Sequence, residues 1–193
     1  GFLCVLAGPE HRFEYANTKY QELVSTKDLV GKSVAEALPE VVQQGFIDLL
    51  DRVFASGEPF SAYSAKVVLR RVPGAMPVTR YLDFVYQPIR DVAGTVTGIL
   101  AQGEDVTERV EAEAALRASE NRFRVMADGV QVLIWVTDAL GNIEFVNRGY
   151  CEFFGVTRDE IVARGWRPLV HPEDVVEYVA AYDAARLARS PFH

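Results

Sequence analysis

The chain has 193 residues, of which 49% are hydrophobic and 24% charged, which is enough to form one large or two small globular domains. No apolar run approaches the roughly 20 residues of a membrane span, and no basic leader followed by an apolar segment opens the chain, so we expect neither a direct membrane contact nor a signal peptide. The formal net charge of −7 argues against nucleic acid and anionic bilayers as partners.

An internal repeat organises the sequence. When the chain is shifted by 130 positions against itself, residues 2–6 align with 132–136 and residues 13–17 align with 143–147, without gaps. In both copies, two apolar runs flank a turn rich in Gly, Pro, Asp or Asn, which is the pattern of a β-hairpin. Asn17 and Asn147 end the second run and are suited to cap the helix that follows. The repeat therefore predicts two copies of one module.

The first copy continues into helices and then into further strands. After the hairpin, the predicted elements are helices at residues 18–24, 33–38 and 43–55, followed by strands at residues 62–72, 79–90 and 95–104. Antiparallel strands with the helices grouped in the middle of the sequence predict an α+β fold, in which the helices cover one face of the sheet. The second copy reaches residue 193 after its helices, so we expect it to hold only the N-terminal part of the module.

Several short motifs, in order along nearly the whole chain, resemble those of the PAS family of sensory domains. They are Asn17, the turn Asp91-x-x-Gly94 with Gly98 beyond it, the closing Asp105-Val106-Thr107-Glu108-Arg109, and residues 115–124, 134–138 and 171–174. The resemblance implies a five-stranded antiparallel sheet of order 2-1-5-4-3, with a pocket between the sheet and the helices. It divides the chain into a complete first PAS domain at residues 1–105, a helical, coiled-coil connector at residues 106–128 and a truncated second PAS copy at residues 129–193.

Strand alternation and helix faces indicate which side chains would line such a pocket. The candidate lining residues are Cys4, Tyr20, Phe46, Leu50, Phe84, Tyr86, Ile99 and Ala101. Two interpretations stay open. The pocket accepts a small-molecule ligand, or these aromatic and aliphatic side chains fill an ordinary core.

The connector carries two candidate features. Asp105 stands three residues before Glu108 at the junction from strand to helix, the spacing of a capping box, and we assign Asp105, Thr107 and Glu108 to capping and signal relay. Apolar and small residues then recur every 3.5 positions, as in a left-handed coiled coil. This seam consists of Ala112, Leu116, Ser119, Phe123 and Met126. It predicts a homodimer, and the alternative is a solvated helix that packs on its own domain.

The resemblance to the PAS family also argues against flavin and haem as cofactors, because this sequence lacks the residues that cofactor-binding relatives carry. Flavin-binding relatives carry a reactive cysteine in the helix before the long one and a Gln two residues before the closing Asp, whereas Cys151 falls in a first helix and Gly103 takes the Gln position. Haem-binding relatives need an axial His on the long helix, but His11 lies in a hairpin turn and His171 suits a structural role at a helix start. The two cysteines stand alone, so we predict no metal site, no disulfide, a cytoplasmic location and two thiols that pack as small core residues.

The sequence holds no Gly-rich phosphate loop, Gly-x-Ser-x-Gly elbow or His-Glu-x-x-His motif, so we predict that this segment is not itself an enzyme. By resemblance, it is the sensory and signal-relay region of a bacterial signalling protein, with a sensor histidine kinase as the first choice. The alternatives are the sensor region of a cyclic-dinucleotide enzyme, a dimerisation module that binds no small molecule, and a small-molecule enzyme that reuses the pocket.

Overall fold

The computed structural model describes residues 1–70, 76–188 and 190. The chain forms two compact units, Gly1–Ala114 and Ala115–His193. Residues 71 and 72, which end the predicted strand 62–72, lie outside the described residues. Within the described ranges, no helix combines the length and the hydrophobicity that crossing a bilayer requires.

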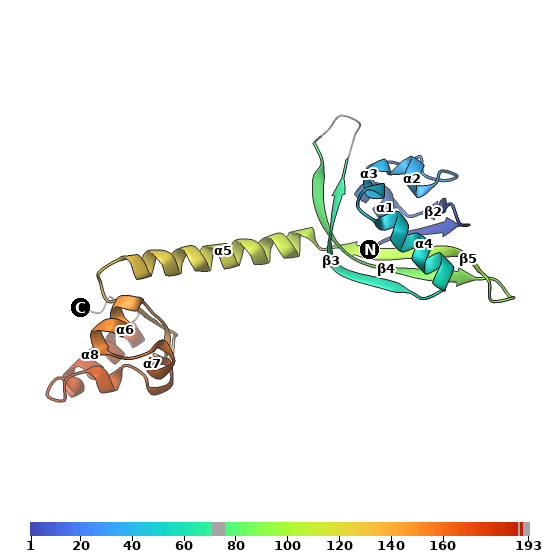
Figure 1. Cartoon of the computed structure of the whole chain (residues 1–193). Helices are drawn as coiled ribbons and strands as arrows, with labels where there is room; N and C mark the ends of the chain where they lie inside the picture. The colour runs from blue at the N-terminus through green and yellow to red at the C-terminus, as the bar shows by residue number, and fades with distance from the viewer. Residues whose placement is uncertain (71–75, 189, 191–193) are drawn as a thin grey trace. The chain divides into compact units, whose positions relative to one another are not determined.

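The first unit is a single sheet with helices on one face (Figure 1). Its elements in chain order are β1 (Phe2–Ala7), β2 (Arg12–Ala16), α1 (Thr18–Val24), α2 (Val34–Ala37), α3 (Pro39–Val42), α4 (Phe46–Ser56), β3 (Phe60–Leu69), β4 (Val78–Arg90) and β5 (Val96–Asp105). All neighbouring strands are antiparallel, and their order is β2-β1-β5-β4-β3. The predicted α+β fold and strand order are confirmed.

Alternation along β1 explains where the core of the first unit lies. Phe2, Cys4 and Leu6 are buried, whereas the residues between them are partly exposed. Because successive side chains of a strand point to opposite faces, these three share the face that the helices cover. Leu50 and Val53 of α4 belong to the same buried cluster. The alternation of β1 and the apolar face of α4 thus build one core.

The helical segment differs from the prediction at two points. The helix predicted over residues 43–55 begins only at Phe46, because Gly45 has a φ angle of 81°, a left-handed conformation that a helix does not continue through. The helix predicted over residues 33–38 is present as α2, but a separate short helix that the sequence pattern did not predict, α3, begins at Pro39. Ser33 and Glu36 form a capping box at the start of α2.

The second unit contains a two-stranded hairpin followed by short helices. Helix α5 (Thr107–Gly129) begins in the first unit and ends in the second, where it is followed by β6 (Trp135–Thr137), β7 (Ile143–Val146), α6 (Arg148–Phe154), α7 (Arg158–Arg164), the 3-10 helix η1 (Arg167–Leu169) and α8 (Val175–Ala188). The buried cluster of this unit includes Tyr150, Ile161, Trp166 and Tyr182. The hairpin-plus-helices module therefore occurs twice, as predicted.

The register of the two hairpins corrects the gapless alignment. The side-chain oxygen of Asn17 accepts a hydrogen bond from the Leu3 N–H at 3.0 Å, and that of Asn147 accepts one from the Ile134 N–H at 2.9 Å. The two asparagines are 130 positions apart, but their partners are 131 apart. The pairing of residues 2–6 with 132–136 is therefore wrong by one position, because the turn between β1 and β2 is one residue longer.

Candidate functional site

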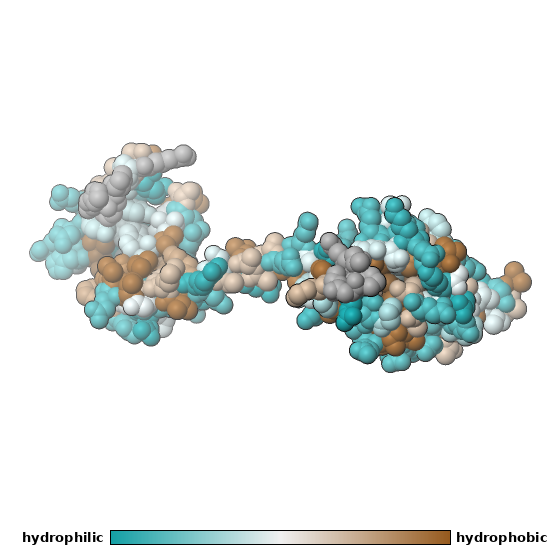
Figure 2. All heavy atoms as spheres, turned by 90° about the horizontal axis from the view of Figure 1, so that it is seen from above, coloured by the Kyte–Doolittle hydropathy of each residue, from teal (hydrophilic) through white to brown (hydrophobic). Residues whose placement is uncertain are grey.

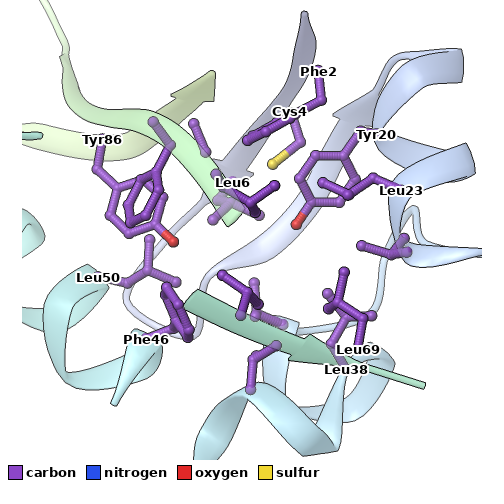
Figure 3. Close-up of a pocket in the computed structure, with 17 residues that line it drawn as sticks. Phe2, Cys4, Leu6, Tyr20, Leu23, Leu38, Phe46, Leu50, Leu69 and Tyr86 are labelled. Carbon is purple, nitrogen blue, oxygen red and sulfur yellow. The ribbon is translucent and has the colours of Figure 1, made fainter. Parts of the chain in front are cut away.

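The first unit encloses an apolar cavity between its helices and its sheet (Figure 3). The cavity has a volume of about 60 Å³. Its lining consists of Phe2, Cys4, Leu6, Tyr20, Leu23, Val24, Val34, Leu38, Val41, Phe46, Leu50, Val67, Leu69, Leu82, Phe84, Tyr86 and Ala101. Sites for drug-sized ligands typically measure about 300–1,000 Å³, so in this conformation the cavity has room only for a guest much smaller than a drug-sized ligand.

The predicted pocket residues all line this cavity except Ile99. Ile99 lies opposite Leu6 in the sheet and is fully buried, so it packs in the core without reaching the cavity. The structure therefore brings together Cys4, Tyr20, Phe46, Leu50, Phe84, Tyr86 and Ala101. Their role as ligand contacts stays a prediction.

Sequence reasoning missed part of the cavity wall. Leu38 lines it from the end of α2, Val41 from the unpredicted helix α3, and Leu69 from β3. No periodic pattern in the sequence indicated α3. Phe2 and Leu6 could have been predicted as lining residues, because they alternate with Cys4 along the same strand and so point to the same face.

Three polar side chains face the cavity. The hydroxyl oxygens of Tyr20 and Tyr86 and the sulfur of Cys4 point into it (Figure 3). Burial raises the pKa of Cys4 to about 12, an effect that a polar contact with Tyr20 partly opposes. Burial also raises the pKa of Tyr20 and of Tyr86, and the neighbouring Cys4 adds to both shifts. At neutral pH the three groups are therefore uncharged, and Cys4 is a thiol rather than the reactive thiolate.

Gln44 ties the helices over the cavity to the outer strand of the sheet. Its side-chain amide accepts a hydrogen bond from the Val68 N–H and donates one to the Val68 carbonyl oxygen, each at 2.8 Å. The Glu40 carboxylate accepts a further bond from the Arg70 N–H at 3.1 Å. Glu40 belongs to α3 and Gln44 follows it, so the wall that α3 supplies is fixed to the edge of β3.

Strand β5 leads directly from the cavity to helix α5. Ala101 lines the cavity, and the carboxylate of Asp105 accepts hydrogen bonds from the Thr107 N–H, at 3.0 Å, and from the Thr107 hydroxyl. The same hydroxyl oxygen accepts a bond from the Tyr81 N–H at 2.9 Å. The first residue of α5 is thus held by both β4 and β5.

This geometry differs from the predicted capping box, in which Asp105 would have accepted a bond from Glu108. The Val106 N–H donates to the Tyr81 carbonyl oxygen at 2.8 Å. Val106 therefore continues the pairing with β4, and the helix starts one residue later than the box requires. An ion pair of 3.2 Å between Arg109 and Asp83 of β4 adds a second link between α5 and the sheet.

Helix α5 carries the predicted seam on its solvent-exposed surface. Ala112, Leu116, Ser119, Phe123 and Met126 are all exposed. The exposed fractions of Leu116 and Met126 are 61% and 66%, and Figure 2 shows apolar residues open to solvent along this helix. Phe123 has a second role, because its ring centre lies 5.0 Å from that of Phe145 within the second unit.

The C-terminal end of α5 is held by the second hairpin. The Asn147 side-chain amide donates hydrogen bonds to the carbonyl oxygens of Ala127 and Val132, both at 2.8 Å. The neighbouring Arg148 N–H donates to the Asp128 carboxylate at 2.7 Å. Asn147 is fully buried, and its bond to Ala127 is shielded from water. One side chain therefore connects the last turn of α5 with the start of α6.

His11, His171 and the second cysteine are not among the residues that line the cavity. His11 is buried in the turn after β1, and its Nε2 lies 2.8 Å from a carboxylate oxygen of Asp51 on α4. His171 is exposed, and its Nδ1 accepts a bond of 3.4 Å from the Glu173 N–H. Cys151, expected in the core, is partly exposed on α6. Among the described residues, no group of three or more His, Cys, Asp and Glu could hold a metal ion.

Comparison with known families agrees with this architecture. Residues 1–111 match a family profile described as PAS fold, and residues 121–186 match a second profile described as PAS domain. The chain belongs to the PAS family, with two PAS regions in tandem.

Individual relatives cover smaller parts. The uncharacterized protein y4lL of Sinorhizobium fredii is 39% identical over 71 residues, which are 37% of this chain and 9% of that protein. The chain thus spans a small fraction of the curated relative that it matches. The solved PAS domain of BvgS from Bordetella pertussis is similar at 25% identity, over 63% of this chain and 88% of that one, with a TM-score of 0.47. The PAS domain of the histidine kinase ThkA is similar at 17% identity, over 54% of this chain and 100% of that one, with a TM-score of 0.42.

Proposed function

We propose that the first unit is a sensory module that takes up a small molecule in its cavity and passes the resulting change to α5. The observation that carries this proposal is the continuity of β5. Ala101 lines the cavity, and Asp105 on the same strand binds the first residue of α5. A guest that displaces β5 therefore acts on the start of the helix without an intermediate element.

The relay residues suit this task for a physical reason. The bond from Thr107 to the ionised carboxylate of Asp105 is charge-assisted, and such bonds are about twice as strong as neutral ones. We propose that these bonds pass a small displacement of β5 on to α5. Glu108 lies in the first turn, where a negative charge interacts favourably with the helix dipole.

We propose that the output is the pairing of α5 with α5 of a second copy. The support is the seam spacing of 3.5 residues and the exposure of apolar side chains along it, which a partner helix would cover. A change at the start of α5 would then alter the pairing. The rival function, a dimerisation module that binds no small molecule, shares this seam but leaves the cavity without a role.

For the whole protein, we propose a bacterial sensor histidine kinase that works in the cytoplasm. The support is the tandem arrangement of two PAS units joined by a helix, which is typical of such kinases, together with two cysteines that form no disulfide. Cyclic-dinucleotide enzymes share the arrangement. Coding sequence that continues past residue 193 decides between them, since a kinase requires a phosphoacceptor His and an ATP-binding domain.

Native mass spectrometry of the chain purified from cells tests the sensory proposal. We expect a co-purified small molecule that is absent from Ala101→Leu, because the larger side chain fills the cavity. Ala93→Leu, at an exposed turn position, should retain the molecule. Hydrogen exchange of the Thr107 and Val110 amides should be faster or slower in Ala101→Leu than in the control. Identical exchange, with no bound molecule in either protein, would leave only the dimerisation module.

A further inference from the structure

The cavity offers hydrogen bonds without offering charge. Among the described residues that line it, Cys4, Tyr20 and Tyr86 carry the polar side-chain atoms, and every other lining side chain is a hydrocarbon. A carboxylate, phosphate or ammonium group would lose its hydration there and find no opposite charge, which is strongly unfavourable. The geometry therefore excludes ions as guests.

Water also fits this space badly. A cavity of about 60 Å³ exceeds the roughly 10–15 Å³ that one water molecule requires, so several waters would have room. Each buried water needs two to four polar partners. The lining side chains offer two hydroxyl groups and a thiol, and Tyr20 and Cys4 already satisfy each other in part. Several waters would therefore leave hydrogen bonds unmade.

A guest with an apolar body and one polar atom would bring no charge into the cavity and would leave few hydrogen bonds unmade. Tyr20 and Tyr86 lie on α1 and β4, and their hydroxyl oxygens both point into the space between the helices and the sheet (Figure 3). A neutral tyrosine hydroxyl both donates and accepts, so a single guest oxygen can accept from either ring. The remaining surface of the guest would contact Leu, Val and Phe side chains.

We propose that the cavity selects small uncharged molecules that carry one carbonyl or hydroxyl oxygen on a compact apolar body. Short or cyclic ketones and alcohols of about half a dozen non-hydrogen atoms belong to this class. Tyr20 and Tyr86 determine the specificity by binding that oxygen. Cys4 contributes a neutral thiol, so binding is noncovalent. The inference rests on the proposed sensory function of the same cavity.

Three ring compounds of nearly equal size test this class on the full chain. Cyclopentanone carries the oxygen, methylenecyclopentane replaces it with an apolar carbon, and cyclopentylammonium carries a positive charge. We expect cyclopentanone to bind about tenfold more tightly than methylenecyclopentane, as one hydrogen bond allows, and cyclopentylammonium to show no saturable binding. Titration followed by chemical shifts of methyl groups that line the cavity gives the dissociation constants.

Variants identify the groups responsible. Tyr20→Phe combined with Tyr86→Phe keeps both rings and should abolish the preference for the ketone. Tyr63→Phe removes a hydroxyl from a side chain that is 82% exposed and should preserve it. If the double variant does not fold, each single variant should lower the preference. A preference that survives in every folded variant, or equal binding of the ammonium compound, overturns the proposed class.

Xenon separates this inference from the function on which it rests, because apolar cavities bind xenon without regard to polar groups. Xenon binding without any binding of cyclopentanone overturns the ligand class and leaves a sensory cavity. If neither binds, the cavity does not open to small guests, and the proposed sensory function fails together with the inference.

Discussion

The side chain of Asn147 donates a hydrogen bond of 2.8 Å to the carbonyl oxygen of Ala127, and this bond joins the last turn of α5 to the second hairpin. Asn147 also donates to the Val132 carbonyl oxygen and accepts from the Ile134 and Tyr150 N–H groups. A fully buried amide with all these partners holds its surroundings in one arrangement.

Asn147→Asp should destabilise the second unit. The substitution removes both donated bonds and places a carboxylate against two carbonyl oxygens, so we expect the free energy of unfolding of this unit to fall by about 2–4 kcal/mol. Both tryptophans of the chain, Trp135 and Trp166, lie in the second unit. Their fluorescence during urea unfolding therefore reports this unit alone. Asn121→Asp on the exposed surface of α5 is the control, with an expected change within about 0.5 kcal/mol. Equal losses in the two variants would contradict a special role for Asn147.

The first unit should lose stability in alkaline solution. The folded state raises the pKa of Cys4 from 9.0 to about 12 and also raises those of Tyr20 and Tyr86. Between these values the unfolded chain releases protons that the folded chain retains, so unfolding becomes more favourable as the pH rises above about 9. Each such group contributes at most roughly 1.4 kcal/mol per pH unit. Thermal melts of the chain between about pH 8 and 11 measure the slope. Tyr86→Phe removes one titrating group and should flatten it, whereas an unchanged slope would mean that Tyr86 ionises freely.

Leu116→Glu should weaken self-association if α5 pairs with a second copy. Leu116 is 61% exposed within its own chain, so a charge there should leave the monomer folded. In a dimer the same charge would be buried between the paired helices and would destabilise their contact. We expect the dissociation constant in analytical ultracentrifugation to rise at least tenfold, or about 1.4 kcal/mol. Phe123 is a poorer target, because it also packs on Phe145. Ala114→Glu is the control, because Ala114 lies two residues away on the same exposed helix but outside the seam. This variant should leave the dissociation constant unchanged. The seam would be refuted by a dimer that Leu116→Glu leaves intact.

Asp105→Ala tests the junction between β5 and α5. The variant removes the acceptor for the Thr107 N–H and hydroxyl, so we expect the free energy of unfolding of the first unit to fall by about 1–2 kcal/mol. Glu104→Ala, at an exposed neighbouring position, is the control. The melting temperature of the first unit is the measurement. An equal melting temperature for Asp105→Ala and the control would show that the helix start is held by other groups.

The periodic parts of this fold could be predicted from the sequence, because each depends on neighbours along the chain. Alternation in β1, the hairpin turns and the asparagines that follow them are local patterns, and they led to the sheet and to most of the cavity. The separate helix α3 begins at Pro39, and α4 begins only after the left-handed Gly45. Both features depend on single residues that interrupt the periodic pattern, so periodicity could not predict them.

Long-range contacts account for the remaining differences. The start of α5 is decided by Tyr81, whose carbonyl oxygen binds the Val106 N–H from a strand 25 residues earlier. Asn147 reaches Ala127 across 20 residues. Spacing within the helix predicted a capping box at Asp105 and could not reveal either partner. The slip by one position between the hairpins has the same origin, since only the paired strands show which turn is longer.

The bonds from Gln44 and Glu40 to β3 have a consequence beyond the cavity. β3 is an outermost strand of the sheet, and the unpaired backbone groups of such a strand can recruit a strand from another molecule. Gln44 occupies both backbone groups of Val68, and Glu40 occupies the N–H of Arg70. The contacts that fix Gln44 and Glu40 to β3 therefore also leave fewer free backbone groups on this edge strand for a strand of another molecule to pair with.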